Sequence, residues 1–282
     1  MSAVDIAHLR TWVGKENLVA DDLGLFPARA LAAAFDHERP PQKGDALPPS
    51  WHWLYFLDFP STSGTGADGH PKKGGFLPPV SLPRRMWAAG KLQIEQPLLL
   101  GTPARKQSTI RSVDLKEGKS GALVFVNIEH ALYQNERLCI IEEQNVVYRD
   151  MPSGPAPLPP GETAPTDAQW VKTVVPDPVL LFRFSALTYN GHRIHYDRDY
   201  ATQQEFYPGL VVHGPLLATL LLDFAANQAK DKRVANFSFR AVRPTFDHAP
   251  FKLCGKRNGD QLSLWTVDPE GFIGMSAKAD LV

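Results

Sequence analysis

The chain has 282 residues, of which 43% are hydrophobic and 21% are charged, as in an average globular protein. Its thirty basic and thirty acidic residues cancel, which argues against a nucleic-acid partner because such proteins normally carry a basic excess. The same composition excludes disordered, collagen-like and coiled-coil chains, and the length predicts one large domain or two moderate ones.

The cysteine content and the apolar runs indicate where in the cell the protein is located. Cys139 and Cys254 are too few for a disulfide framework and too far apart for a zinc-ligand pattern, and free thiols are typical of intracellular proteins. Residues 1–10 are charged and lack the apolar run of a secretory signal. The most apolar stretch, 216–222, is far shorter than the roughly 20 residues that span a bilayer. We expect a cytoplasmic protein with no membrane partner.

In the first eighty residues, 19–35 carry helix signals: an acidic pair that can cap the N-terminus, a proline suited to the first turn and an alanine-rich run. Residues 61–79 are rich in Gly, Ser and Pro and predict a surface loop or lid. An aromatic block lies between them, interpreted as core packing by Trp51, Trp53, Tyr55, Phe56 and Phe59.

From residue 86 to 148 the pattern is β-like. Apolar and polar residues alternate at 91–95 and 109–113, and a glycine turn at 118–121 precedes a run at 122–128; a further run, 138–148, closes the series. Short strands separated by turn signals predict an antiparallel sheet.

Residues 151–166 hold six prolines in sixteen positions and show no helix or strand period, so we interpret them as a linker. They separate a degenerate N-terminal unit, 1–150, from a C-terminal unit, 167–282. The latter is predicted to contain a strand-like run at 180–185, a polar segment at 188–200 and an apolar helix at 208–228. Four β-like runs follow, at 233–242, 251–257, 261–267 and 272–281. A long apolar helix followed by antiparallel strands predicts a helix wrapped in a curved sheet, and two similar α+β units overall.

The candidate chemistry is concentrated in residues 190–195, which read Asn-Gly-His-Arg-Ile-His. His192 and His195 lie three positions apart, and His213-Gly214 opens the apolar helix about twenty residues later. A glycine there leaves backbone N–H groups open at the positive end of the helix dipole, where an oxyanion can bind. Histidines facing such a pocket are suited to general acid–base work on a carbonyl compound.

These segments resemble the hydratase signature of MaoC-like hot-dog proteins, which include (R)-specific enoyl-CoA hydratases and type 2 hydroxyacyl-thioester dehydratases. The signature, Asp-x-Asn-Pro-x-His followed by a helix opened by His-Gly, puts the family's catalytic histidine on His195 and its oxyanion N–H on Gly214. The family's aspartate falls on Asn190, and an amide orients a water but does not accept its proton. The Asn-Pro pair falls on His192-Arg193.

A narrower resemblance covers most of the chain. The segments 189–197 and 207–216, with Pro-Arg-Arg-Met-Trp-Ala at 83–88, are similar to the branch that contains mesaconyl-C4-CoA and itaconyl-CoA hydratases. This implies a tandem (double) hot-dog fold, with antiparallel sheets wrapped around central helices. It also implies reversible hydration of a C5 dicarboxylic acyl-CoA to citramalyl-CoA, as in itaconate degradation, with no cofactor beyond the coenzyme A of the substrate.

In the implied mechanism His195 is the general base on a water that Asn190 holds, and the Gly214 N–H stabilises the enolate. His192 either orients Asn190 or the water, or supports the loop. His213 either belongs to the substrate and CoA site or hydrogen-bonds a neighbouring loop, and we favour the second role. We expect Tyr189 to form a pocket wall.

Three arginines are candidates for binding the substrate. Arg84, Arg85 or Arg193 would hold a free carboxylate or a CoA phosphate, because guanidinium matches both in a bidentate way. The alternative for Arg84 and Arg85 is a solvated basic pair. The N-terminal unit has no equivalent histidine frame, and we expect it to widen the pocket and shape the CoA site.

Two other functions remain open: a 3-hydroxyacyl-ACP or 3-hydroxyacyl-CoA dehydratase of fatty acid metabolism, and a non-catalytic acyl-CoA-binding protein. A metal site at His192, His195 and Asp197 is disfavoured, because no distant third ligand is evident. We expect a homodimer of such chains.

Overall fold

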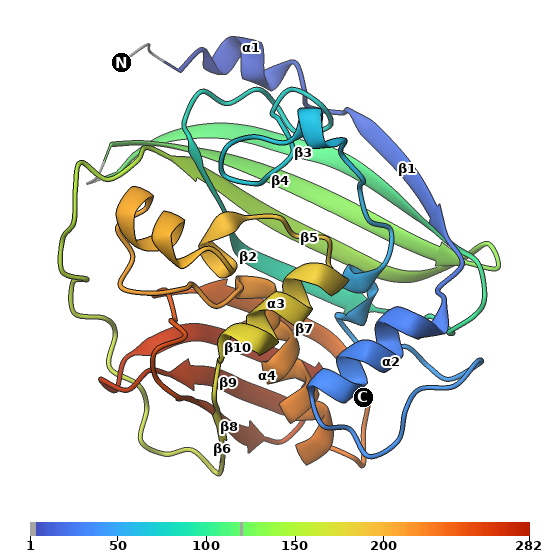
Figure 1. Cartoon of the computed structure of the whole chain (residues 1–282). Helices are drawn as coiled ribbons and strands as arrows, with labels where there is room; N and C mark the ends of the chain where they lie inside the picture. The colour runs from blue at the N-terminus through green and yellow to red at the C-terminus, as the bar shows by residue number, and fades with distance from the viewer. Residues whose placement is uncertain (1–3, 119–120) are drawn as a thin grey trace.

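A computed structural model describes residues 4–118 and 121–282 (Figure 1). Within these ranges ten strands form one antiparallel sheet in the order β1-β3-β4-β5-β2-β7-β10-β9-β8-β6. The strands are β1 (Glu16–Asp21), β2 (Arg84–Ile94), β3 (Ala104–Gly118), β4 (Gly121–Gln134), β5 (Arg137–Arg149), β6 (Trp170–Val174), β7 (Val234–Ala241), β8 (Phe251–Asn258), β9 (Gln261–Val267) and β10 (Ile273–Leu281). The helices are α1 (Ile6–Arg10), α2 (Leu25–Ala34), α3 (Pro178–Leu187) and α4 (Gly214–Gln228).

The sheet repeats one strand order twice. Strands β1-β3-β4-β5-β2 are mirrored by β6-β8-β9-β10-β7, and the two sets join where β2 pairs with β7, with Leu92 opposite Phe237. The first strand of each set is followed, four positions later, by a helix: α2 after β1 and α3 after β6. These two helices contact each other. The linker placed at 151–166 lies between the sets without helix or strand, and its boundaries stay a prediction.

Helix α4 makes the two sets unequal. It packs on β2 and β7 to β10, and its buried residues lie on all sides, as expected for a helix enclosed in a core. At the matching point of the first set the chain forms only a short 3₁₀ turn, Trp51–Leu54. Figure 1 shows α2, α3 and α4 gathered against the lower part of the sheet, leaving the upper strands to the 61–83 segment and α1.

The predicted strands after residue 86 are present, except for the run at 180–185. Several other local predictions are also corrected. Residues 180–185 belong to α3 rather than to a strand. An apolar run of this length suits either element, and the helix is set by Asp177, whose side chain accepts a hydrogen bond from the Leu180 N–H at 2.8 Å, with Pro178 in the first turn.

The helix predicted at 19–35 is likewise divided. Its start belongs to β1, and Asp21 does not cap α2 but accepts hydrogen bonds from the N–H groups of Leu23 and Phe56. Helix α4 begins at Gly214 instead of residue 208, because 208–213 contain a bend and a single bridge of Val211 to Phe246. The aromatic block is mostly core, except Phe59, which is 71% exposed.

None of the helices in the described part of the chain has the length and apolar character needed to cross a bilayer.

Candidate active site

Four histidine rings form a row where the two strand sets meet. His70 comes from the N-terminal loop, and its ring centroid lies 4.0 Å from that of His192. The His192 ring is 5.4 Å from His195 and perpendicular to it, and the His195 ring stacks on His213 at 3.7 Å. The structure thus unites three predicted site residues with one that the sequence did not reveal.

His195 is prepared to act as a base. It ends a 3₁₀ turn, Arg193–His195, and is buried. Its Nδ1 lies 2.7 Å from the carbonyl oxygen of Val211, and since a carbonyl only accepts, Nδ1 carries the proton and Nε2 keeps its lone pair. Burial lowers the pKa of His195 to about 4, with the Val211 bond opposing this, so the ring is neutral at pH 7.

Asn190 fixes the shape of the motif loop. Its side-chain oxygen accepts a hydrogen bond from the His192 N–H at 3.0 Å, and its own N–H donates to the carbonyl of Ser185 at 2.9 Å. With the oxygen occupied, the side-chain NH₂ is the group left to hold a ligand.

Gly214 lies at the first turn of α4, and its N–H has no hydrogen-bond partner among the described residues. Pro215 follows and brings no N–H of its own. The positive end of a fifteen-residue helix therefore presents an open donor next to the histidine row.

His213 supports His195 from behind. It is fully buried and shares a 2.8 Å hydrogen bond with Ser185 of α3, so its partner lies on a helix rather than on the loop expected. Burial, followed by His195 and His192, lowers the pKa of His213 well below its usual value. The stacked pair is thus neutral.

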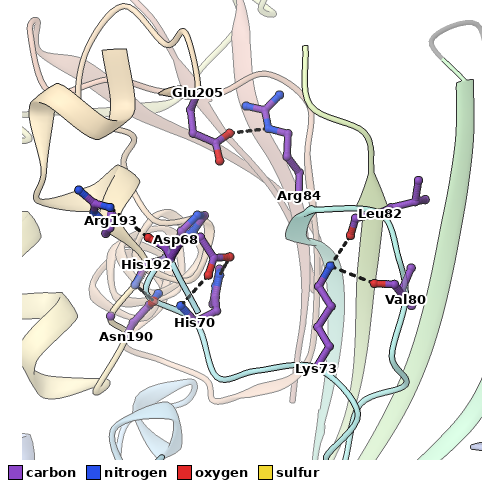
Figure 2. A network of polar contacts seen from close by, with 12 residues as sticks. Asp68, His70, Lys73, Val80, Leu82, Arg84, Asn190, His192, Arg193 and Glu205 are labelled. Atoms are coloured by element: carbon purple, nitrogen blue, oxygen red, sulfur yellow. Dashed lines mark hydrogen bonds and ion pairs between the residues drawn. The ribbon is translucent and has the colours of Figure 1, made fainter. Parts of the chain in front are cut away.

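The N-terminal loop docks directly on the motif (Figure 2). The Arg193 N–H donates to the carbonyl of Asp68 at 2.9 Å, and the Arg193 guanidinium donates to that of Ala67 at 3.1 Å. Gly69, at φ +88°, passes so close to Gly191 that a Cβ there would lie 1.8 Å from its carbonyl oxygen. Only glycine permits this approach. Instead of only widening the pocket, the N-terminal unit contributes one of its walls.

This loop carries an Asp–His dyad. Asp68 Oδ2 accepts a hydrogen bond from His70 Nδ1 at 2.9 Å, and Asp68 Oδ1 accepts one from the His70 N–H at 3.0 Å. Burial opposes it, but the hydrogen bonds and charge of His70 hold the pKa of Asp68 well below its usual range. Burial, then His70 and His195, lowers the pKa of His192 well below its usual value.

The two arginines at the start of β2 differ in their surroundings. Arg84 is buried, with its Nε 2.6 Å from Glu205 and its guanidinium over the Tyr207 ring at 4.7 Å, so its charge is already matched (Figure 2). Arg85 lies opposite Tyr148 on β5 and has no carboxylate partner in the described ranges. Burial is the largest cause that lowers the pKa values of His70, His192 and Lys73, and the positive charge of Arg85 adds to it.

Arg193 and Tyr189 lie outside the row of rings. Arg193 pairs with Asp197 at 2.7 Å and stacks on Tyr200 at 4.3 Å, a structural role for its guanidinium. Tyr189 is 55% exposed and packs edge-on against Phe59. Tyr207, which packs on Arg84, also lines a cavity of about 760 Å³. None of the four histidines lines this cavity, so we do not assign the reaction to it.

Sequence reasoning missed Asp68, His70 and Glu205. The Asp-Gly-His sequence at 68–70 was visible inside the glycine-rich loop, but nothing local placed it beside residues 190–195.

Comparison with known proteins gives four findings. The model of the hydroxyacyl-thioester dehydratase type 2 family matches residues 50–247. The chain is 48% identical over 279 residues, 98% of each chain, to a protein of Chloroflexus aurantiacus named mesaconyl-C(4)-CoA hydratase. The structure of HtdX from Mycobacterium tuberculosis aligns with a TM-score of 0.68 at 16% identity, covering 95% of this chain and 100% of that one. Rv0216 from the same organism, described as a double hot-dog fold, aligns with a TM-score of 0.57 at 11% identity, covering 96% of each chain. The fold is thus a double hot-dog.

Proposed function

Because the chain belongs to the hydroxyacyl-thioester dehydratase type 2 family, we propose that it is a hydro-lyase that reversibly hydrates an α,β-unsaturated acyl-CoA thioester. The observation that carries this is the pairing of a buried neutral base, His195, with the open N–H of Gly214 at a helix start. A base and an oxyanion donor are two of the groups that addition of water to an enoyl thioester requires.

In the proposed step, the Nε2 of His195 takes a proton from a water that the Asn190 NH₂ holds. The water oxygen bonds to the β-carbon, and the electrons of the double bond move toward the thioester. The N–H of Gly214 donates a hydrogen bond to the enolate oxygen that forms. Protonation of the α-carbon then completes the hydration, and the reverse sequence is the dehydration.

The substrate class we propose is a C5 dicarboxylic thioester, mesaconyl-C4-CoA or itaconyl-CoA, which would give citramalyl-CoA. The relative named above supports the first of these. Arg85 supports a free carboxylate, since it is a guanidinium without an acidic partner that acts on His70 and His192, whereas Arg84 is matched by Glu205. We expect turnover without any added cofactor, because all groups used come from the chain and the substrate.

We further propose a cytoplasmic homodimer. Free buried thiols at Cys139 and Cys254 support an intracellular location. Exposed apolar side chains on the adjoining helices α2 and α3, Phe26 at 76% and Phe182 at 62%, support an interface there. Light scattering on the purified protein measures the mass directly.

The test is a spectrophotometric hydration assay of mesaconyl-C4-CoA, itaconyl-CoA and crotonyl-CoA, with wild type and His195→Gln. We expect fast turnover of a dicarboxylic thioester that falls about 100-fold or more in the variant. Retention of more than a tenth of the rate by His195→Gln would make the mechanism wrong. Turnover of crotonyl-CoA alone would move the role toward fatty acid metabolism, and binding without turnover would indicate an acyl-CoA-binding protein.

A further inference from the structure

The addition of water needs a group that accepts a proton from water and a group that gives a proton to the α-carbon. His195 is the base, and Asn190 is an amide that carries no exchangeable acid proton at neutral pH. The opposite unit brings a second acid–base pair to the motif, the Asp68–His70 dyad on the docked loop. We propose that Asp68–His70 is the second acid–base group of the site. This rests on the proposed hydratase function.

The geometry of the dyad fits an acid. Since His70 Nδ1 is bound to Asp68 at 2.9 Å, its Nε2 is the only ring nitrogen that can serve a ligand, and it has no hydrogen-bond partner in the part of the chain that the structure describes. The hydrogen bond to Asp68 fixes the ring in orientation; burial lowers the pKa of His70, and the bond and charge of Asp68 oppose this shift.

His192 lies between the two ends. Its ring is within 4.0 Å of the His70 ring and 5.4 Å of the His195 ring, and neither of its ring nitrogens has a partner among the described residues. It therefore lies between the base and the acid, and Figure 2 shows it beside His70 over the docked loop.

The proposed step conserves atoms and charge. His195 Nε2 gains the proton that the water loses as the C–O bond forms, and His70 Nε2 gives its proton to the α-carbon as the double bond is consumed. After product leaves, His195 releases the proton that it gained and His70 takes one up from water, which restores the starting state. Dehydration runs the same steps backwards: His70 takes the α-proton and His195 gives its proton to the leaving hydroxide.

Asp68, His70 and His192 also bring ligand atoms within 4.8 Å of one another, an arrangement that a metal ion can use. Three features favour proton transfer instead. The coordinating atom of His70 on the Asp68 side is already hydrogen-bonded. The two rings lie face to face, tilted by only 37°, instead of converging edge-on. The charges of Arg85 and Lys73 act on His70, and they oppose binding of a divalent cation there.

The groups that face His70 are Asp68, His192, Arg85 and Lys73, with His195 beyond His192. Only Asp68 among them is negative. Replacing Asp68 by asparagine therefore removes the one charge that stabilises protonated His70, and the alkaline limb of the pH–kcat profile should move to lower pH.

The test uses His70→Ala and Asp68→Asn, with Lys72→Ala, an exposed residue of the same loop, as the control. Wild-type turnover of mesaconyl-C4-CoA is measured first, because its absence overturns the proposed function rather than this inference. For His70→Ala we expect kcat to fall about 100-fold with little change in KM. Added imidazole should raise the kcat of His70→Ala about tenfold. Pyrazole, a ring of the same size that is not protonated at neutral pH, should not raise it. Lys72→Ala should behave as wild type.

Three results would overturn the inference. One is a folded His70→Ala that retains more than a third of wild-type kcat, and another is equal restoration by imidazole and pyrazole. The third is a stoichiometric transition metal in purified wild type that Asp68→Asn removes. If His70→Ala does not unfold cooperatively, the alkaline limb of Asp68→Asn decides: a shift to lower pH supports the inference and an unchanged limb refutes it.

Discussion

The rings of His195 and His213 are stacked, with centroids 3.7 Å apart and planes inclined by 19°. His213 is held by Ser185 on its other side, so the stack fixes the base in the plane that the Val211 hydrogen bond selects. Burial is the main cause that lowers the pKa of both rings, and the charge that His195 would carry adds to it at His213.

The first prediction concerns stability against pH. The pKa of His195 is depressed to about 4 in the folded chain, so the unfolded chain binds a proton between pH 6.5 and 4 that the folded chain does not. Stability from this group is therefore complete above pH 6.5 and is lost as the pH falls to 4, by up to about 3 kcal/mol. Urea unfolding at pH 7 and pH 5 should show a smaller loss for His195→Gln, which does not titrate. Equal losses of stability between pH 7 and pH 5 in the two proteins would contradict this prediction.

Arginine substitutions should separate substrate binding from folding. Arg85→Gln should raise KM for mesaconyl-C4-CoA by about 10- to 100-fold, the loss of a charge-assisted hydrogen bond, and leave KM for crotonyl-CoA unchanged. Arg84→Gln leaves buried Glu205 without its partner and should lower stability by about 3–5 kcal/mol. Substrate titrations and thermal unfolding of both variants check this. Equal effects of Arg85→Gln on both substrates would point to a CoA contact.

The docked loop should be sensitive at Gly69. A Cβ there would overlap the Gly191 carbonyl, and φ +88° disfavours any side chain, so Gly69→Ala should undock the loop and lower kcat at least about tenfold. Gly75→Ala is the matched control, since a Cβ at Gly75 meets nothing within 4 Å. Kinetic assays on the two variants compare them. Similar activities would show that docking does not matter for turnover.

A proline substitution at Gly214 removes the backbone N–H, and an alanine substitution at the same position is the matched control. Gly214→Pro lacks the donor, and we expect kcat to fall about 10²- to 10³-fold. Gly214→Ala keeps the N–H, and its Cβ meets Trp87 O only at 3.5 Å, so it should retain most of the activity. Steady-state rates decide, with circular dichroism to verify helix content. A nearly active proline variant would remove this N–H from the mechanism.

Local sequence patterns were enough to predict an element where its own apolar residues determine whether it is a helix or a strand. The run 91–94 alternates strictly between exposed and buried residues, and α4 is a long apolar run, so both were predictable. The run at 180–185 is too short to distinguish a buried strand from a buried helix, and the Asp177 cap that decides it was overlooked.

The site was predictable only as far as the two motif segments, 190–195 and 213–214, contain it. Asn190, His192 and His195 come from a continuous motif, whereas Asp68 and His70 reach it through a backbone contact between Gly69 and Gly191 that no local pattern encodes. The difference between Arg84 and Arg85 likewise depends on Glu205, which only the folded chain brings to Arg84.

The pairing of β2 with β7 also governs the order in which the protein can be completed on the ribosome. Strands β1 to β5 emerge first and can form their half of the sheet, but the free edge of β2 gains its neighbour only after residues 234–241 have been made. An open edge strand is a template for pairing with another chain. The nascent half-molecule is thus the aggregation-prone species, and truncation within the proline-rich segment would make that exposure permanent.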